Sequence, residues 1–276
     1  MTTGPGGGTA DLDRLAQIEA RLDDAAQRDA DVIEALTGIR KSLKSFRGSE
    51  KRGIGRVAVL LARLKAAYDV SLDERFLDVA TPLVQSRRTM LDLDRLFTLW
   101  ESARNAAAVD GAAAEIGTFR GGSAALVAEA LRRFGGTPRE LHVVDTFEGH
   151  LDASFSAHDD EVQRGKFQQT QFEDVKAFLG GYPGAHVHMG DGPMVVAAWP
   201  ERRYSLVHLD VDLYQPTLDC LRYFGPRLSP GAVLIVDDYE APACPGIRVA
   251  VEEHLAADPG FQTWRLRAEQ IVLVKR

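Results

Sequence analysis

The stretch AAAEIGTFRGGSAALVAEAL, residues 112–131, joins a short apolar run to a glycine-rich turn and then to a segment with apolar residues at helical spacing. A strand that passes through glycines into a helix is typical of α/β proteins in which a ligand approaches the turn. The P-loop pattern GxxxxGK[ST] is absent, because the spacing differs and the turn holds no lysine. The dinucleotide pattern GxGxxG is also absent, because Thr118 and Phe119 follow Gly117.

Short apolar runs recur along the chain and predict further strands. Together with the first run they cover residues 112–117, 141–145, 185–189, 205–210, 232–237, 261–266 and 270–275. Helix-length segments separate the first five runs, which predicts parallel strands in a doubly wound α/β sheet. Only a short polar connection separates the last two, which predicts an antiparallel C-terminal hairpin. We therefore expect a mostly parallel seven-stranded sheet over residues 111–276.

The region before residue 111 has a different texture. Residues 1–10 are rich in glycine and predict a disordered tail. Over residues 11–47 apolar side chains recur at heptad spacing, which fits either a self-associating coiled coil or an amphipathic helix packed on its own domain. A linker is expected at 45–55, and then a helical subdomain over 56–110 with breaks near 69–71 and at Pro82. A homo-oligomer is the expected assembly, and the coiled-coil alternative for the heptad segment is one way to form it.

The composition limits the partners. Among 276 residues, 40 acidic side chains exceed 33 basic ones and give a net charge of −7, which argues against nucleic acid as the main partner. The two cysteines form neither a zinc pattern nor a disulfide framework, which favours a reducing compartment. The N-terminus shows no secretory signal, and no apolar run approaches the roughly 18 residues that span a bilayer. We expect a cytoplasmic protein without a membrane span.

The glycine turn has the acidic-x-Gly-x-x-x-Gly pattern of the first motif in Rossmann-like class I methyltransferases. In that motif the glycines let the backbone approach the amino-acid part of S-adenosylmethionine (SAM), and the acidic residue meets the ammonium group. The predicted SAM contacts in this motif are Glu115, Gly117, Arg120, Gly121, Gly122 and Ser123.

Two later strand ends extend the predicted cofactor site. Asp145 ends the next strand and can accept hydrogen bonds from both ribose hydroxyls, with Thr146 beside it. Gly190 and Asp191 follow the strand after that. Asp191 has two readings of equal weight, a contact with the adenine amine or simply an Asp-Gly turn. Together the three strand ends favour SAM over a nicotinamide dinucleotide.

Two strands end in aspartates. VHLDVDLY, residues 207–214, carries Asp210 and Asp212, and GAVLIVDDYEAP, residues 231–242, carries Asp237 and Asp238. In a parallel sheet these strand ends share one edge, and a hard divalent cation would relieve the repulsion between their carboxylates. We predict Asp210, Asp237 and Asp238 as ligands of Mg²⁺ or Mn²⁺. The alternatives are an exposed edge strand for the first stretch and a cap of the next segment for the second.

Methylation of an aliphatic hydroxyl also needs a base, because the pKa of such a hydroxyl is about 16. Asp212 is the predicted base. His208 is the competing choice, because the ordinary pKa of histidine suits the task. It lies deeper in the strand, however, which favours a packed supporting position.

With these residues the chain resembles the macrocin O-methyltransferase (TylF-type) family of SAM- and Mg²⁺-dependent sugar O-methyltransferases. The matching stretches are EIGTFRGGS (115–123), VVDTFEG (143–149), MGD (189–191), the long block 207–239 and PGIRVAVEEH (245–254). The resemblance implies metal ligation by the first Asp of DVD and by the DD pair, with the second Asp of DVD as base. It also implies SAM contacts at Thr89 and Met90. His150 departs from the family pattern and opens a polar segment, 150–175, which we expect to be a lid.

The sequence therefore predicts a metal-dependent O-methyltransferase whose partner is a small glycosylated acceptor, a metabolite or a glycolipid. The alternatives are a catechol-type O-methyltransferase, a cephalosporin-hydroxylase-like enzyme of the same fold, and a non-catalytic SAM-binding scaffold protein. The carboxylates present at both strand ends argue against the scaffold protein.

Overall fold

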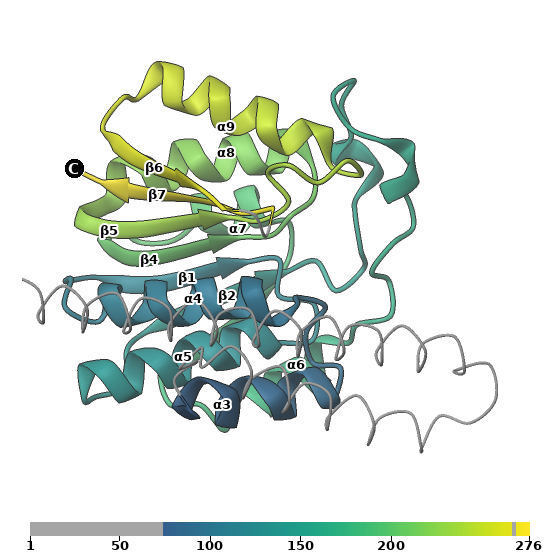
Figure 1. Ribbon diagram of the computed structural model, residues 1–276. Coiled ribbons are helices and arrows are strands. Elements are labelled where there is room, and N and C mark those ends of the chain that lie inside the picture. The colour runs from purple at the N-terminus through teal and green to yellow at the C-terminus, as the bar shows by residue number, and fades with distance from the viewer. Residues whose placement is uncertain (1–73, 267–268) are drawn as a thin grey trace, which may run out of the picture. The chain divides into compact units, whose positions relative to one another are not determined.

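The computed structural model describes residues 74–266 and 269–276, and residues 75–276 form one compact unit (Figure 1). The predicted tail, heptad helix and linker lie outside the described residues, as does the predicted break near 69–71. In the described part of the chain, no helix combines the length and the apolarity needed to cross a bilayer.

The sheet in the described residues has seven strands in the order β3-β2-β1-β4-β5-β7-β6. Strands β1 to β5 pair in parallel, whereas β7 runs antiparallel to both β5 and β6. The prediction of a doubly wound, mostly parallel sheet with an antiparallel hairpin is confirmed. β5 begins earlier than predicted, because Leu228 already pairs with Tyr204 before a shift in register. The strands are β1 Ala112–Ile116, β2 Leu141–Asp145, β3 Ala185–Met189, β4 Tyr204–Leu209, β5 Leu228–Val236, β6 Phe261–Arg265 and β7 Ile271–Lys275.

Helices cover both faces of this sheet. Helices α4, α5 and α6 lie on one face, and α7, α8 and α9 lie on the other (Figure 1). Helix α3 packs on α4 through Phe76, whose ring centroid lies 5.2 Å from that of Phe97. The helices are α3 Glu74–Gln85, α4 Leu93–Ala106, α5 Gly122–Gly135, α6 Phe172–Leu179, α7 Gly192–Ala197, α8 Tyr214–Phe224 and α9 Pro245–Ala257. Short 3₁₀ turns are η1 Asp152–Ser154, η2 Glu161–Gln163 and η3 Gly225–Arg227.

The central strands β1 and β4 are buried along their whole length. Both carry mainly apolar side chains, as expected of parallel strands that helices cover on both faces. Two of the polar residues inside them, Glu115 and His208, are only 1% exposed. Because a buried polar group is costly unless it is hydrogen-bonded, these two side chains need partners inside the protein.

The prediction that Pro82 breaks a helix is wrong. Helix α3 continues from Glu74 through Pro82 to Gln85. A proline in the last turn removes only one hydrogen bond before the helix would end anyway, which is a smaller cost than in the middle of a helix. The amide and hydroxyl of Ser86 then both donate to the Pro82 carbonyl, at 3.0 and 2.7 Å, and close the last turn.

Candidate active site

A pocket lies at the edge of the sheet where the parallel strands end. The amide of Asp210 donates to the carbonyl of Ile116, the last residue of β1, at 2.9 Å. The amide of Asp237 donates to the carbonyl of Leu209, the last residue of β4, at 2.9 Å. These bonds hold the residues after each strand at one level of the edge. The predicted residues that line the pocket are Thr89, Met90, Gly117, Thr146, Ser123, Asp145, Gly190, Asp191, Asp210, Asp212 and Asp238.

Gly117 begins the glycine loop after β1 and lies directly beside the backbone of Asp210, which follows β4. Its φ is +83°, a conformation that side chains with a Cβ rarely adopt. A Cβ at this position would lie 1.8 Å from the carbonyl oxygen of Asp210. The glycine therefore lets the loop pass directly beside the predicted metal ligand.

Substitution of Gly117 by alanine should lower the free energy of unfolding by about 3 kcal/mol or more, because backbone strain and a clash add together. Gly136→Ala is the matched control: its φ is +77° and no atom lies within 4 Å of the added Cβ. That control should lose only about 1–2 kcal/mol in urea unfolding. Equal losses for the two variants would show that the Asp210 carbonyl moves aside without cost.

Asp145, the predicted ribose ligand, also organises the glycine loop. Its Oδ2 accepts hydrogen bonds from the amides of Thr118 at 2.9 Å and Phe119 at 2.8 Å. Its Oδ1 accepts from the amide of Phe147 at 2.8 Å. A carboxylate can accept about four hydrogen bonds, so one direction on Oδ1 is left for a ligand. The contact of Asp145 with ribose stays a prediction. Its hydrogen bonds to the amides of the glycine loop, in contrast, are present in the structure.

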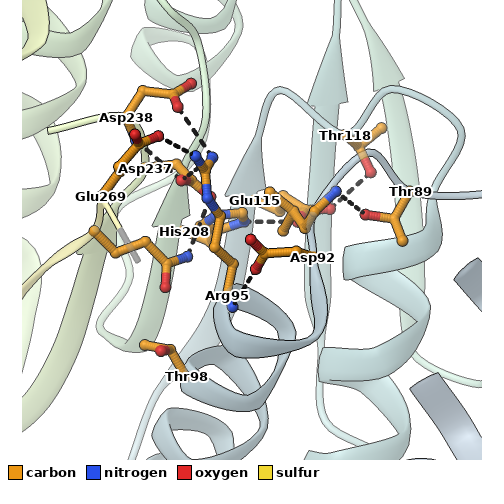
Figure 2. Close-up of polar contacts among 12 residues, drawn as sticks. Thr89, Asp92, Arg95, Thr98, Glu115, Thr118, His208, Asp237, Asp238 and Glu269 are labelled. Carbon is orange, nitrogen blue, oxygen red and sulfur yellow. Dashed lines mark hydrogen bonds and ion pairs between the residues drawn. The ribbon is translucent and has the colours of Figure 1, made fainter. Parts of the chain in front are cut away.

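Glu115 does not lie where the sequence predicted it. Its side chain points away from the pocket and accepts hydrogen bonds from the Thr118 hydroxyl at 2.7 Å (Figure 2). The other carboxylate oxygen lies 2.8 Å from Nδ1 of His208 (Figure 2). Because helices cover both faces of β1, Glu115 is buried, and its partners Thr118 and His208 lie inside the protein. Glu115 does not line the pocket, and its contact with the SAM ammonium group stays a prediction.

Three other predicted cofactor residues lie outside the pocket. The guanidinium of Arg120 lies 5.0 Å from the ring centroid of its neighbour Phe119. Gly121 takes φ +81° at the start of α5. A Cβ on Gly122 would lie 2.7 Å from the backbone carbonyl of Arg88. These glycines therefore allow close packing of α5, and the prediction that they contact the cofactor is not supported.

Asp191 and Met90 keep side chains that a ligand can reach. Asp191 precedes α7 but makes no capping hydrogen bond with its side chain. Burial raises its pKa, and the nearby Asp219 adds to this shift. Met90 is 71% exposed although it lines the pocket. The side chain of Asp191 does not cap α7, and that of Met90 is exposed, so both are available to a ligand. Their contacts with the cofactor stay predictions.

Four carboxylates converge beyond the ends of β4 and β5. Carboxylate oxygens of Asp210 and Asp237 lie within 4.8 Å of each other, and so do those of Asp212 and Asp238. Burial raises the pKa of Asp210 well above its ordinary value, and repulsion from Asp237 and Asp212 adds to this shift. Burial also raises the pKa of Asp238 to about 8, with a further contribution from Asp212. The predicted convergence is present, together with the repulsion that a cation would relieve.

His208 supports this cluster from behind. It is 1% exposed and does not line the pocket. Its Nδ1 lies 2.8 Å from Glu115, and its Nε2 lies 3.5 Å from Asp237. Burial alone would lower the pKa of His208, but these two carboxylates outweigh it and raise the pKa to about 10. The ring does not line the pocket, which favours the supporting position over the base, and the assignment of His208 as base stays a prediction.

Asp212 faces the pocket from a left-handed backbone conformation with φ +61°. Its Oδ2 lies 3.2 Å from Nε2 of His150, and its Oδ1 accepts from the Cys244 thiol at 3.5 Å. Burial would raise the pKa of Asp212, but the contacts with His150 and Asp238 outweigh burial and lower it. The ionised carboxylate is therefore favoured, as a general base requires.

His150 lines the pocket, and the sequence analysis assigned it no partner. Its side chain is 11% exposed, and its ring packs against those of Phe155 and Phe167 at centroid distances of 6.4 and 5.4 Å. It joins the segment 150–175 to Asp212 on the loop after β4. The departure of His150 from the family pattern was the only signal in the sequence, and it did not indicate this partner.

Arg95 is the second residue that the sequence analysis missed. It lies in the first turn of α4, where its amide donates to the capping carboxylate of Asp92 at 3.0 Å. One guanidinium nitrogen donates to Oδ1 of Asp237 at 2.8 Å and to Oδ1 of Asp238 at 3.0 Å. The other donates to Glu269 at 2.5 Å (Figure 2). The protein thus places a cation of its own against the predicted metal ligands.

Besides the contact of His150, further hydrogen bonds hold the segment 150–175 over the pocket, and four of its residues line the pocket. Asp159 accepts a hydrogen bond from the amide of Tyr214, the first residue of α8, at 2.7 Å. The buried side chain of Gln163 donates to the Ala243 carbonyl at 3.0 Å and to Cys244 at 2.8 Å. Opening of this segment as a lid stays a prediction.

The donor set fits a hard divalent cation. Asp210 and Asp238 present carboxylate oxygens to the pocket, and such oxygens suit Mg²⁺ or Mn²⁺ better than zinc. Over residues 74–266 and 269–276, no protein group donates a hydrogen bond to the carboxylate of Asp210. Nε2 of His208 is also buried beside the cluster without a hydrogen-bond partner. The assignment of the metal ligands stays a prediction.

A sheet of this order, with a pocket at the ends of its parallel strands and an antiparallel β7, defines the Rossmann-like class I methyltransferase fold. The chain belongs to the macrocin-O-methyltransferase (TylF) family, whose sequence model matches residues 57–259. The resemblance that the motifs indicated is therefore confirmed.

Two relatives illustrate the similarity. The 8-demethyl-8-(2,3-dimethoxy-alpha-L-rhamnosyl)-tetracenomycin-C 4'-O-methyltransferase of Streptomyces olivaceus is 33% identical over 171 residues, which are 56% of this chain and 64% of that protein. The mycinamicin III 3''-O-methyltransferase of Micromonospora griseorubida is 28% identical over 179 residues, 60% of this chain and 69% of that protein. The first relative is thus matched over slightly less than two thirds of its own length.

Solved structures support the fold. The O-methyltransferase NovP has a TM-score of 0.61 at 24% identity, covering 68% of this chain and 82% of its own. A calicheamicin methyltransferase has a TM-score of 0.56 at 20% identity, covering 73% of this chain and 90% of its own. At these identities the likeness establishes the fold alone.

Proposed function

We propose that this chain is a SAM-dependent O-methyltransferase that methylates a hydroxyl group on the sugar of a glycosylated small molecule, with Mg²⁺ or Mn²⁺ in the site. The observation that carries the proposal is one pocket that joins the glycine loop after β1 to the aspartates after β4 and β5. The family supports the reaction, and the names of the two relatives, one a rhamnosyl-tetracenomycin-C 4'-O-methyltransferase and one a mycinamicin III 3''-O-methyltransferase, support the acceptor class.

The cofactor would lie across the ends of β1, β2 and β3. Gly117 lets the backbone approach it, Asp145 has one acceptor direction left for ribose, and the side chain of Asp191 is available for adenine. Met90 and Ser123 complete this part of the pocket wall. The sulfonium of SAM already activates the methyl group, so the main tasks of the protein are positioning and removal of a proton.

The acceptor hydroxyl would lie between the methyl group and the aspartates. A divalent cation, held by Asp210, Asp237 and Asp238, would act as a Lewis acid that stabilises the developing alkoxide. Asp212 faces the same space and would take the proton of the hydroxyl. His150 would orient the Asp212 carboxylate, and the segment 150–175 would exclude water from the reacting groups.

The alternatives from the sequence carry less support. A non-catalytic scaffold has no need for four convergent carboxylates beside a cofactor loop, because such a cluster is costly to bury. No observation on the pocket favours a catechol or a cephalosporin-like substrate over a sugar.

A methyl-transfer screen tests the proposal. The full chain is incubated with SAM, Mg²⁺ and a panel of deoxysugar glycosides, with aglycones and catechols as controls. We expect the mass gain of one methyl group on the sugar of at least one glycoside, with equimolar S-adenosylhomocysteine. Methylation confined to catechols or aglycones would contradict the sugar assignment, and absence of SAM binding would contradict the enzyme itself.

A further inference from the structure

Arg95 lies where a cation that bridged Oδ1 of Asp237 and Oδ1 of Asp238 would lie. A single guanidinium nitrogen is 2.8 Å from Oδ1 of Asp237 and 3.0 Å from Oδ1 of Asp238 (Figure 2). A magnesium ion approaches carboxylate oxygens to about 2.0–2.1 Å. An ion that binds these two oxygens would therefore overlap with the nitrogen, and the two cations exclude each other.

Oδ1 of Asp237 has no spare direction for a metal while Arg95 is in place. Its Oδ1 accepts from Arg95 and from the backbone amide of Asp238 at 2.9 Å. Its Oδ2 accepts from the Gln270 side chain at 3.1 Å and lies 3.5 Å from Nε2 of His208. The side chain is 0% exposed, so it cannot turn outward. Since each carboxylate oxygen accepts about two bonds, a metal can reach Oδ1 only if a donor leaves.

The donor that can leave is Arg95. The Asp238 amide belongs to the backbone, whereas the guanidinium ends a long flexible side chain that is 18% exposed. The cap by Asp92 ties only the backbone of Arg95, so the side chain can move without unwinding α4. Glu269 already binds the second guanidinium nitrogen at 2.5 Å and is 41% exposed. Glu269 is therefore a carboxylate that can still bind the guanidinium when a metal ion binds the two aspartates.

We infer that Arg95 is an internal cation that competes with the metal for Asp237 and Asp238, and that Glu269 holds the guanidinium when the metal is bound. This inference rests on the metal site of the proposed function. Without metal, Arg95 offsets part of the repulsion between the carboxylates and keeps the cluster assembled. With metal, the guanidinium moves toward Glu269, and the affinity for the metal is set by the balance between the two positions.

Binding of Mn²⁺ to the full chain, followed by calorimetry and electron paramagnetic resonance without acceptor, tests the inference. Arg95→Gln should bind Mn²⁺ about 10- to 100-fold more tightly than the unaltered chain, because charge-assisted hydrogen bonds no longer have to break. Arg95→Lys keeps the charge and should gain less. Glu269→Gln should bind more weakly, because the displaced guanidinium loses its second carboxylate.

Arg104→Gln is the matched control, because Arg104 lies on the same helix, is 52% exposed and pairs only distantly with Glu101, at 3.7 Å. Its Mn²⁺ affinity should equal that of the unaltered chain. Equal or weaker binding by Arg95→Gln would overturn the competition and leave the metal site intact. If Arg95→Gln does not fold, the Mn²⁺ affinity of Glu269→Gln tests the inference instead. An affinity equal to that of the unaltered chain would overturn it. If no chain binds Mn²⁺, the metal site and the inference both fail, whereas the methyl-transfer screen still judges the proposed reaction.

Discussion

Replacement of Asp212 by asparagine should lower the rate of methyl transfer by about 10²- to 10⁴-fold, the usual contribution of a general base. The amide keeps the shape of the side chain but cannot take a proton. Because the glycine loop and Asp145 lie on other strands, the dissociation constant of SAM should change little. Single-turnover methyl transfer measures the first effect, and calorimetric titration with SAM measures the second.

Two variants frame this result. Asp78→Asn removes an exposed carboxylate on α3 and should leave the rate unchanged. His150→Gln should cost only about tenfold, because His150 orients Asp212 through the 3.2 Å contact rather than taking the proton. If instead His150→Gln abolishes turnover while Asp212→Asn retains it, then histidine is the base and the carboxylate orients the ring.

Removal of divalent metal by EDTA should abolish turnover, and added Mg²⁺ or Mn²⁺ should restore it. A Lewis acid at a developing alkoxide contributes several kcal/mol to the barrier, which corresponds to a loss of about 10³-fold or more. Asp210→Asn should have the same effect without rescue by Mg²⁺. Asp210 is the ligand of choice for this test, because it faces the pocket and its loss strands no hydrogen-bond donor in the described residues.

Asp94→Asn serves as the control, because Asp94 is exposed in the first turn of α4. It should remain fully active and fully dependent on metal. Undiminished methyl transfer in EDTA would contradict the metal assignment. Asp237 and Asp238 would then form an ion-pair cluster with Arg95 that anchors α4 to the sheet and would not bind a metal.

The fold followed from local features of the sequence. Apolar runs of strand length, separated by helix-length segments, are short-range patterns, and they predicted the β-strands to within a few residues. Pro82 was misread because a proline near the end of a helix costs less than one in its middle. The convergence of Asp210 with Asp237 also followed, because parallel strands end at a common edge.

The contacts of individual side chains did not follow. Glu115 matched a cofactor motif, yet packing on both faces of β1 turned it toward His208 and away from the pocket. Arg95 contributes from a helix that precedes the whole sheet, and no spacing in the sequence links it to Asp237. His150 likewise reaches Asp212 from the far side of the pocket.

By itself, the sequence determined the order of strands and helices, the glycine turn and the strand-end carboxylates, because periodicity and turn chemistry act over a few residues. Only the tertiary structure decided which groups face the pocket, which carboxylates form ion pairs with Arg95, and which histidine contacts the predicted base. Those choices depend on contacts between distant segments, and burial in a common core, rather than local spacing, selects them.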